Sequence, residues 1–398
     1  MRSLPLREPS LASPLRSMRA LSTHRFLFRL ALAGTNVFAW VFIFQYFYLV
    51  EPDIAHGLAR VALLYALSQT ITCLVTPFAA RLLRSGARRA LLLGTVAAAS
   101  SFVVLGAALE GFWGGAEVPI ALAAFACGLG VYRALYWIPY EAEAEAAGKR
   151  AKNIFAELFI ALAPLLGGAC VAASLYGPVW LLFGGACLIL ISVIPIFSLR
   201  DIHEGFSWGY RETFGHMIDP ANRALVTQSF LEGIAGAALL LFWPLAIFLI
   251  TGWSYGMLGV VLSLTFVLAI FMRSLVRKGL RKASLHASST LNIVFAVTPW
   301  IFRMLVATPF GVILVDSYFH TTTPRRIGLD PVVFEQAADG GSFLDEYTAL
   351  KEMALSLGRI ALCAVGAAAA LTVSLPVAFV VVFVCAGLAA AAVALKSR

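Results

Sequence analysis

The chain has 398 residues, of which 61% are hydrophobic and 13% charged, and its mean hydropathy is +0.87. Soluble domains are about half apolar and one quarter charged, so this composition excludes an ordinary water-soluble protein. The net charge of +9 is not accompanied by a basic cluster with interleaved aromatic residues, and we therefore expect no nucleic-acid partner.

Apolar runs recur along the whole chain, and most approach the roughly 20 residues that cross about 30 Å of hydrocarbon as a helix. Helices are expected because every backbone N–H and C=O inside a bilayer must be paired within its own segment. The sequence therefore predicts an all-α polytopic membrane protein with about 12 transmembrane helices. The predicted spans are residues 26–50, 58–80, 90–109, 118–140, 153–175, 179–199, 224–250, 256–275, 288–306, 309–323, 350–373 and 376–395.

Positive charge lies almost entirely on one side of these spans. The N-terminus, the longer polar loops and the C-terminus together hold 26 of the 30 Lys and Arg residues. Because Lys and Arg near span ends are retained in the cytoplasm, both termini are predicted to be cytoplasmic. We expect a monomeric, multi-pass protein of the bacterial inner membrane, surrounded by the lipid bilayer.

The cysteines lie in apolar runs and show neither a CxxC nor a Cys/His spacing. Each is interpreted as a small buried hydrophobic residue. We therefore expect no bound metal, no disulfide and no cofactor. The six residues are Cys73, Cys127, Cys170, Cys187, Cys363 and Cys385.

A polar segment of mixed charge, residues 201–223, divides six predicted spans from the next six. We interpret residues 1–200 as an N-terminal six-helix bundle, 201–223 as a cytoplasmic linker and 224–398 as a C-terminal six-helix bundle. Glu157 and Glu352 occupy matching places, each near the start of the fifth span of its half. Two repeated halves with a substrate site between them are typical of alternating-access carriers.

Two short motifs accompany this two-bundle pattern. Residues 81–89, between the second and third spans, carry four arginines, and residues 163–168 read Ala-Pro-Leu-Leu-Gly-Gly in the fifth span. Together with the span count and loop pattern, these motifs resemble the major facilitator superfamily, including the Pro-x-x-Gly-Gly end of its antiporter signature. The usual Asp of the basic loop and the earlier glycines of the antiporter signature are absent. The resemblance implies transport by alternating access and slightly favours efflux.

Parts of the second half also resemble an uncharacterised bacterial branch of this superfamily, which supplies no substrate. These parts are Pro299–Arg303, Val315–Tyr318, Phe334–Glu335 and Leu350–Arg359. The long acidic loop at residues 321–347 is predicted to form a surface helix, with an inner gate as the alternative.

Ionisable side chains inside a span cost roughly 2.5–3.5 kcal/mol on insertion scales, so they normally face the bundle interior and have a partner or a function. The leading candidates for substrate binding or coupling are Arg133, Tyr136, Glu232, Arg303, Asp316 and Arg359. For the secondary candidates, a structural ion pair or a polar contact between helices is the competing interpretation. These are Glu157, Glu352, Asn36 and Gln45.

Arg133 and Glu232 show the clearest patterns. Tyr136 follows Arg133 at i+3, so one helix face carries a cation beside an aromatic ring, which suits an anionic or aromatic substrate. Arg133 also occupies the place of the superfamily's fourth-span arginine, which the resemblance links to proton coupling. Glu232 is our first candidate for a carboxylate that takes up a proton on one side and releases it on the other. The competing interpretation is an ion pair between Glu232 and Arg133 or Arg303.

Arg359 shares a helix face with Glu352 and Ser356. Two interpretations stay open for its guanidinium. It either binds a negatively charged ligand or pairs with Asp316 on the adjacent span.

The leading hypothesis is a secondary transporter that moves a small organic solute across the inner membrane by alternating access, with proton-coupled efflux as one form. We expect no enzyme, because HExxH, Walker and GxSxG motifs and any His/Asp cluster with metal spacing are absent. The alternative is a lipid flippase or a non-transporting membrane partner protein, since the chain is rich in Ala and Phe and poor in buried polar groups.

Overall fold

A computed structural model describes residues 12–112, 114, 117–147, 154–174, 176–199, 201, 206–282, 289–322 and 344–396. Within these ranges, all regular secondary structure is helical, and ten helices are long and apolar enough to cross a membrane. The prediction of an all-α, multi-pass membrane protein is therefore confirmed. Most of the loop at residues 321–347, including Phe334–Glu335, lies outside the described residues.

Helices in the first half of the chain overlap the first six predicted spans, and several are longer than predicted. They are α1 (Ala12–Val50), α2 (Ile54–Leu82), α3 (Ala87–Leu109), α4 (Val118–Ala147), α5 (Ile154–Ala173) and α6 (Gly177–Ile191), which α7 (Val193–Ile196) prolongs. A 3-10 turn, η1 (Leu83–Ser85), joins α2 to α3.

The second half begins with α8 (Tyr210–Ile218) and the 3-10 turn η2 (Pro220–Asn222). One span follows as α9 (Arg223–Ala237), η3 (Ala238–Phe242) and α10 (Trp243–Ile250). The remaining helices are α11 (Tyr255–Lys282), α12 (Ser289–Leu305), α13 (Pro309–Thr322), α15 (Leu344–Thr372) and α16 (Leu375–Lys396). With 17 and 14 residues, α12 and α13 are shorter than the ten candidate spans, so the count of twelve stays a prediction.

The turn between α1 and α2 is short because Asp53 caps α2. Its carboxylate accepts hydrogen bonds from the backbone N–H of Ala55 at 2.7 Å and of His56 at 3.3 Å. The His56 ring bonds to the same carboxylate at 2.7 Å, and these bonds hold the pKa of Asp53 below its ordinary value. The cap therefore starts α2 at Ile54, a few residues after α1 ends at Val50.

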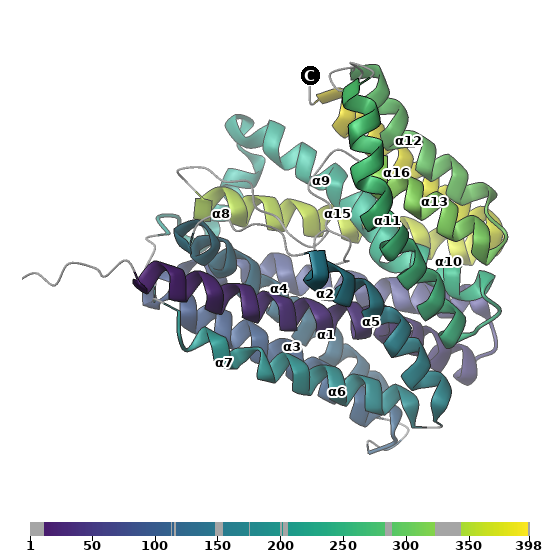
Figure 1. Cartoon of the computed structure of the whole chain (residues 1–398), viewed down its shortest axis with the longest axis horizontal. Coiled ribbons are helices and arrows are strands. Elements are labelled where there is room, and N and C mark those ends of the chain that lie inside the picture. Colours follow the sequence, from purple (N-terminus) through teal and green to yellow (C-terminus); the bar gives the residue numbers. More distant parts are fainter. Residues whose placement is uncertain are drawn as a thin grey trace, which may run out of the picture.

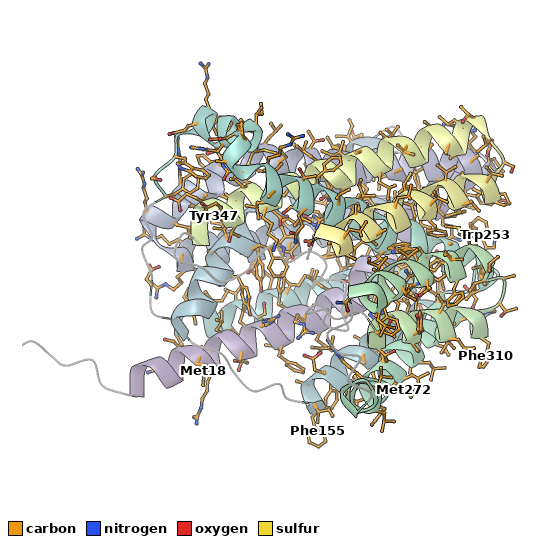
Figure 2. The ribbon with its side chains drawn as sticks, turned by 90° about the horizontal axis from the view of Figure 1, so that it is seen from above. Met18, Phe155, Trp253, Met272, Phe310 and Tyr347 are labelled. Carbon is orange, nitrogen blue, oxygen red and sulfur yellow. The ribbon has the colours of Figure 1, made fainter. Side chains whose placement is uncertain are left out.

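Large apolar side chains point outward as well as inward. Phe155 and Phe310 are 70% and 67% exposed, and Figure 2 shows Phe155 at the edge of the bundle, directed away from it. Such side chains suit hydrocarbon rather than water. Figure 2 also places Met18 and Trp253 near opposite ends of the molecule. We call the end with the α1–α2 and α10–α11 turns the turn end, and the opposite end, which carries α8, the linker end.

Two helix pairs join the first half of the chain to the second. α2 packs along α15, and α5 packs along α11, whereas the other extensive contacts, such as α3 with α4 and α9 with α15, lie within one half. Figure 1 shows α1, α3, α4 and α6 side by side, with α11, α12, α13 and α16 grouped apart from them. The division into two bundles at residues 201–223 stays a prediction.

The α5–α11 pair approaches closely because Gly168 and Gly259 face one another. A Cβ atom on Gly168 would lie 2.5 Å from the carbonyl oxygen of Tyr255 and 3.1 Å from the Cα of Gly259. A Cβ atom on Gly259 would clash with the carbonyl oxygen of Pro164. These neighbours are backbone atoms, so no side-chain rotation relieves the clash. Only glycine allows the two backbones to pack this way.

The span that contains η3 is not a regular α-helix, because η3 has π geometry between α9 and α10. Pro244, in the first turn of α10, has no N–H and cannot bond to the carbonyl of Leu240. A π segment lets the backbone bonds resume with a different register. Such segments are frequent at functional sites.

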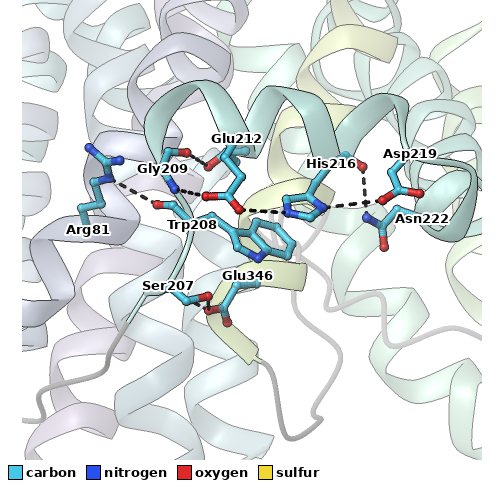
Figure 3. Close-up of polar contacts among 10 residues, drawn as sticks. Arg81, Ser207, Trp208, Gly209, Glu212, His216, Asp219, Asn222 and Glu346 are labelled. Carbon is cyan, nitrogen blue, oxygen red and sulfur yellow. Dashed lines mark hydrogen bonds and ion pairs between the residues drawn. The ribbon is translucent and has the colours of Figure 1, made fainter.

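Polar contacts hold Ser207 and Trp208 against helices of both halves of the chain at the linker end (Figure 3). The Nε of Arg81 donates to the carbonyl oxygen of Trp208 at 3.3 Å. The backbone N–H and hydroxyl of Ser207 donate to Glu346 at 3.1 and 2.9 Å. The Trp208 ring also stacks on His216, with centroids 4.0 Å apart. Because Arg81 belongs to α2 and Glu346 to α15, this segment contacts one helix from each half of the chain.

Candidate functional site

A cavity lies between helices of both halves, with an empty volume of about 600 Å³ that includes open solvent. Most of its wall is apolar, formed by Ala33, Val37, Pro164, Leu239, Leu240, Trp243, Pro244, Leu262 and Phe266. Its polar residues are Arg303, Asp316 and His320. A mostly apolar concave site with a few polar groups is typical of small-molecule binding.

The polar wall is built around an ion pair between α12 and α13. Arg303 donates to Asp316 Oδ1 from Nε at 3.2 Å and from Nη2 at 2.7 Å. The indole N–H of Trp243 donates to the other carboxylate oxygen at 2.7 Å. The guanidinium also lies 4.5 to 5.3 Å from the ring centroids of Phe319, Trp300 and Trp243. Both charges are buried, and three aromatic rings fix the cation in place.

Two polar atoms of this wall have no hydrogen-bond partner among the described residues, namely Arg303 Nη1 and His320 Nδ1. His320 lies one turn after Asp316 on α13, so the two side chains share a helix face. Buried polar atoms are normally hydrogen-bonded. Two of the three polar residues that line the cavity therefore each carry an unused hydrogen-bonding atom.

A second buried cluster forms where α2, α4 and α15 meet. Arg359 Nη1 donates to Gln69 Oε1 at 3.0 Å and lies 3.7 Å from Glu352 Oε1. The Arg133 guanidinium lies over the ring of Tyr65, 5.3 Å from its centroid, one turn before Gln69 on α2. Arg133, Glu352 and Arg359 are at most 1% exposed. The Arg359–Gln69 bond joins the second half of the chain to the first.

Tyr136 belongs to an aromatic stack in the first half. Its ring stacks on Phe28 at 4.4 Å and on Tyr140 at 5.6 Å, and its hydroxyl lies 3.0 Å from His24 Nε2. His24 Nδ1 lies 2.7 Å from the carbonyl oxygen of Ser192. These partners fit a neutral imidazole that donates from Nδ1 and accepts from the tyrosine. His24 was not predicted, because its partners lie on distant helices.

The remaining candidates do not line the cavity. Glu157 forms a two-bond ion pair with Arg29 at 3.0 and 3.1 Å, which ties α5 to α1. Glu232 is half-buried in α9 and accepts a hydrogen bond from Gln228 at 3.0 Å. Of the two candidates on α1, Asn36 is buried and Gln45 is half-buried.

Asp316 pairs with Arg303, so the alternative that joined Asp316 to Arg359 is wrong. Two cavity residues, Trp243 and His320, were not among the predicted candidates. His320 had a readable signal, because it follows Asp316 at i+4. Trp243 had none, since its indole meets Asp316 only through the packing of two different helices.

Replacing Gln69 with leucine is expected to lower the free energy of unfolding by about 1.5–3 kcal/mol, because the buried Arg359 loses a charge-assisted hydrogen bond. Thermal unfolding in detergent measures the change. The control is Thr70→Leu, at the next residue of α2, which is exposed. This variant should change the free energy of unfolding by less than about 0.5 kcal/mol. Equal stability of the two variants would contradict the role given to Gln69.

No family model and no curated protein matches the sequence. Solved structures match along nearly the whole chain. The xylose transporter XylE from E. coli is 13% identical, with a TM-score of 0.59 and coverage of 96% of this chain and 97% of that one. A POT family transporter in complex with 5-aminolevulinic acid is 10% identical, with a TM-score of 0.62 and coverage of 96% and 95%. The nucleoside transporter NupG is 11% identical, with a TM-score of 0.58 and coverage of 96% and 99%.

These likenesses define the class of fold. The chain is a multi-pass membrane protein with the fold of major-facilitator-type transporters, so the resemblance read from its motifs is confirmed at the level of fold. Because the sequence identities to these structures are only 10–13%, the likeness concerns the fold alone.

Proposed function

We propose that the protein is a secondary transporter that moves a small organic solute across a membrane by alternating access and catalyses no chemical reaction. The cavity carries this proposal, because helices of both halves line it and a buried Arg303–Asp316 ion pair lies in its otherwise mostly apolar wall. A site between two bundles is exposed to one side at a time when the bundles rock against each other. The transporter fold supports the same conclusion.

The proposal includes twelve transmembrane helices, with bundles at residues 1–200 and 224–398 and a linker at 201–223. The short helices α12 and α13 complete this count. Both termini and the linker end face the cytoplasm of a bacterial inner membrane, in keeping with the position of 26 of the 30 Lys and Arg residues. The transporter works as a monomer.

Proton coupling is also part of the proposal, because ionisable groups inside spans commonly mark ion pathways. Among the acidic candidates, Asp316 is assigned to the binding step, since it lines the cavity. Glu352 and Arg359, with Arg133 nearby, are assigned to the movement of the halves, since their cluster bonds across the interface. Glu232, half-buried on α9, is the candidate for proton exchange.

Flux in liposomes tests this function. Purified protein is reconstituted with a pH-sensitive dye inside, and organic acids, amides, sugars, amino acids, nucleosides and drug-like cations are added under an imposed proton gradient. At least one solute should produce saturable flux that Asp316→Asn lowers at least tenfold. Glu51→Gln, a change in the exposed turn between α1 and α2, should leave this flux unchanged.

Other outcomes separate the alternatives. Transfer of a fluorescent lipid between leaflets, without flux of any solute, would replace the solute carrier by a lipid flippase. The mostly apolar cavity wall is the observation that favours this second candidate. If the protein showed neither solute flux nor lipid transfer, the remaining interpretation would be a non-transporting membrane partner protein.

A further inference from the structure

The composition of the cavity wall restricts the solutes that it can hold. Nine of its twelve lining residues are apolar, and two polar atoms of the wall lack a partner among the described residues. A sugar or nucleoside carries many hydroxyl groups, and each one left unpaired in such a cavity weakens binding. The wall therefore matches a solute with a single polar group on a carbon-rich body.

The charges at the wall favour a neutral solute. Arg303 and Asp316 carry opposite charges and lie 2.7 Å apart, so each already has its counter-ion. An ion added to this cavity would lose its water without gaining a counter-charge of its own. Besides Asp316 and Arg303, the charged side chain of Arg273 on α11 also interacts electrostatically with His320, but Arg273 does not line the cavity.

We propose, on the basis of the transport function above, that the cavity binds a neutral, carbon-rich solute through one primary amide or undissociated carboxylic acid group. The carbonyl oxygen accepts a hydrogen bond from Arg303 Nη1. The amide N–H or acid O–H donates to His320 Nδ1, which requires the imidazole proton to be on Nε2. The apolar body contacts the side of the cavity formed by Leu262 and Phe266 of α11 and by Leu239 of η3.

Binding to the full-length protein in lipid nanodiscs tests the proposal. The probes are 4-phenylbutanamide and 4-phenylbutanoate at pH 8, which share a carbon skeleton, together with xylose and uridine. Equilibrium dialysis, corrected with empty nanodiscs, measures how much of each probe is bound. The amide should bind saturably at about one per protein and at least tenfold more tightly than the anion. Xylose and uridine should show no saturable binding.

Substitutions in the wall separate site binding from partitioning into lipid. His320→Phe keeps a ring of similar size but removes Nδ1, and Arg303→Lys keeps the charge but removes Nη1. Each should weaken amide binding about tenfold, which corresponds to about 1.4 kcal/mol. His56→Phe, at an exposed position in the turn end, should bind the amide like the unmodified protein. If Arg303→Lys fails to fold, His320→Phe alone decides.

The proposal is overturned if the anion binds more tightly than the amide, if xylose or uridine binds saturably, or if His320→Phe leaves amide binding unchanged. The binding assay involves no flux, so it is independent of the transport assay. Amide binding without transport of any solute would keep this site and remove the proposed function. If a solute were transported equally well by His320→Phe and no amide were bound, the proposed function would stand and this site would be removed.

Discussion

Removing the carboxylate of Asp316 is expected to lower the free energy of unfolding by about 3–5 kcal/mol, because Arg303 is left as a buried charge without its counter-ion. Trp243 loses the acceptor of its indole N–H in the same step. Asp316→Ala should therefore be among the most destabilising single substitutions in the second half. Thermal unfolding of the purified protein in detergent measures this effect.

A double variant distinguishes the loss of a pair from the loss of a single contact. Changing both Arg303→Met and Asp316→Leu should recover most of the stability, since no buried charge then remains. The control is the exposed pair of Arg60 with Glu51, where Glu51→Ala should cost only about 0.2–1 kcal/mol. An Asp316→Ala variant as stable as Glu51→Ala would show that Arg303 does not depend on Asp316.

Replacing Gly168 with leucine is expected to abolish transport and to lower the free energy of unfolding by about 3 kcal/mol. The new side chain would meet backbone atoms of Tyr255 and Gly259, so α5 and α11 would have to separate. Because this pair joins the two halves of the chain, the change acts on an interface that would rearrange in the proposed transport cycle. Flux into liposomes and thermal unfolding together measure the effect.

Gly184→Leu is the matched control. Gly184 lies on α6, is exposed, and has no atom within 4 Å of an added Cβ. This variant should keep both its stability and its flux. Normal flux through Gly168→Leu would mean that close packing of α5 on α11 is not needed for transport.

Hydropathy predicted the helices well because the bilayer restricts the backbone so strongly. A segment in hydrocarbon must satisfy its own N–H and C=O groups, so span position follows from composition alone. The predicted span at 153–175, for example, became α5 at Ile154–Ala173. The break of the sixth span at Ser192 and the π geometry of η3 depend on how carbonyl groups and neighbouring helices meet.

The candidate site was predictable as a set of residues but not as a set of pairs. Arg303, Asp316 and Arg359 were visible because charges inside spans are rare. Their partners were not visible, because pairing depends on how each helix is rotated about its axis. That rotation decides that Arg303 pairs with Asp316 and that Arg359 bonds to Gln69. The cavity itself is lined by residues of seven helical segments, so it cannot be predicted from the spacing of residues within any one of them.

The π segment η3 also sets the phase of the helix that follows it. Each residue of an α-helix advances the side chains by about 100°, so a change of register in η3 turns α10 relative to α9. The same span thereby presents Gly233 to α15 and Trp243 to Asp316. If η3 were to wind into regular α-helix, the indole of Trp243 would swing away from the carboxylate. The two ends of this span would then present different side chains to the neighbouring helices, and no covalent bond of the chain would have to break.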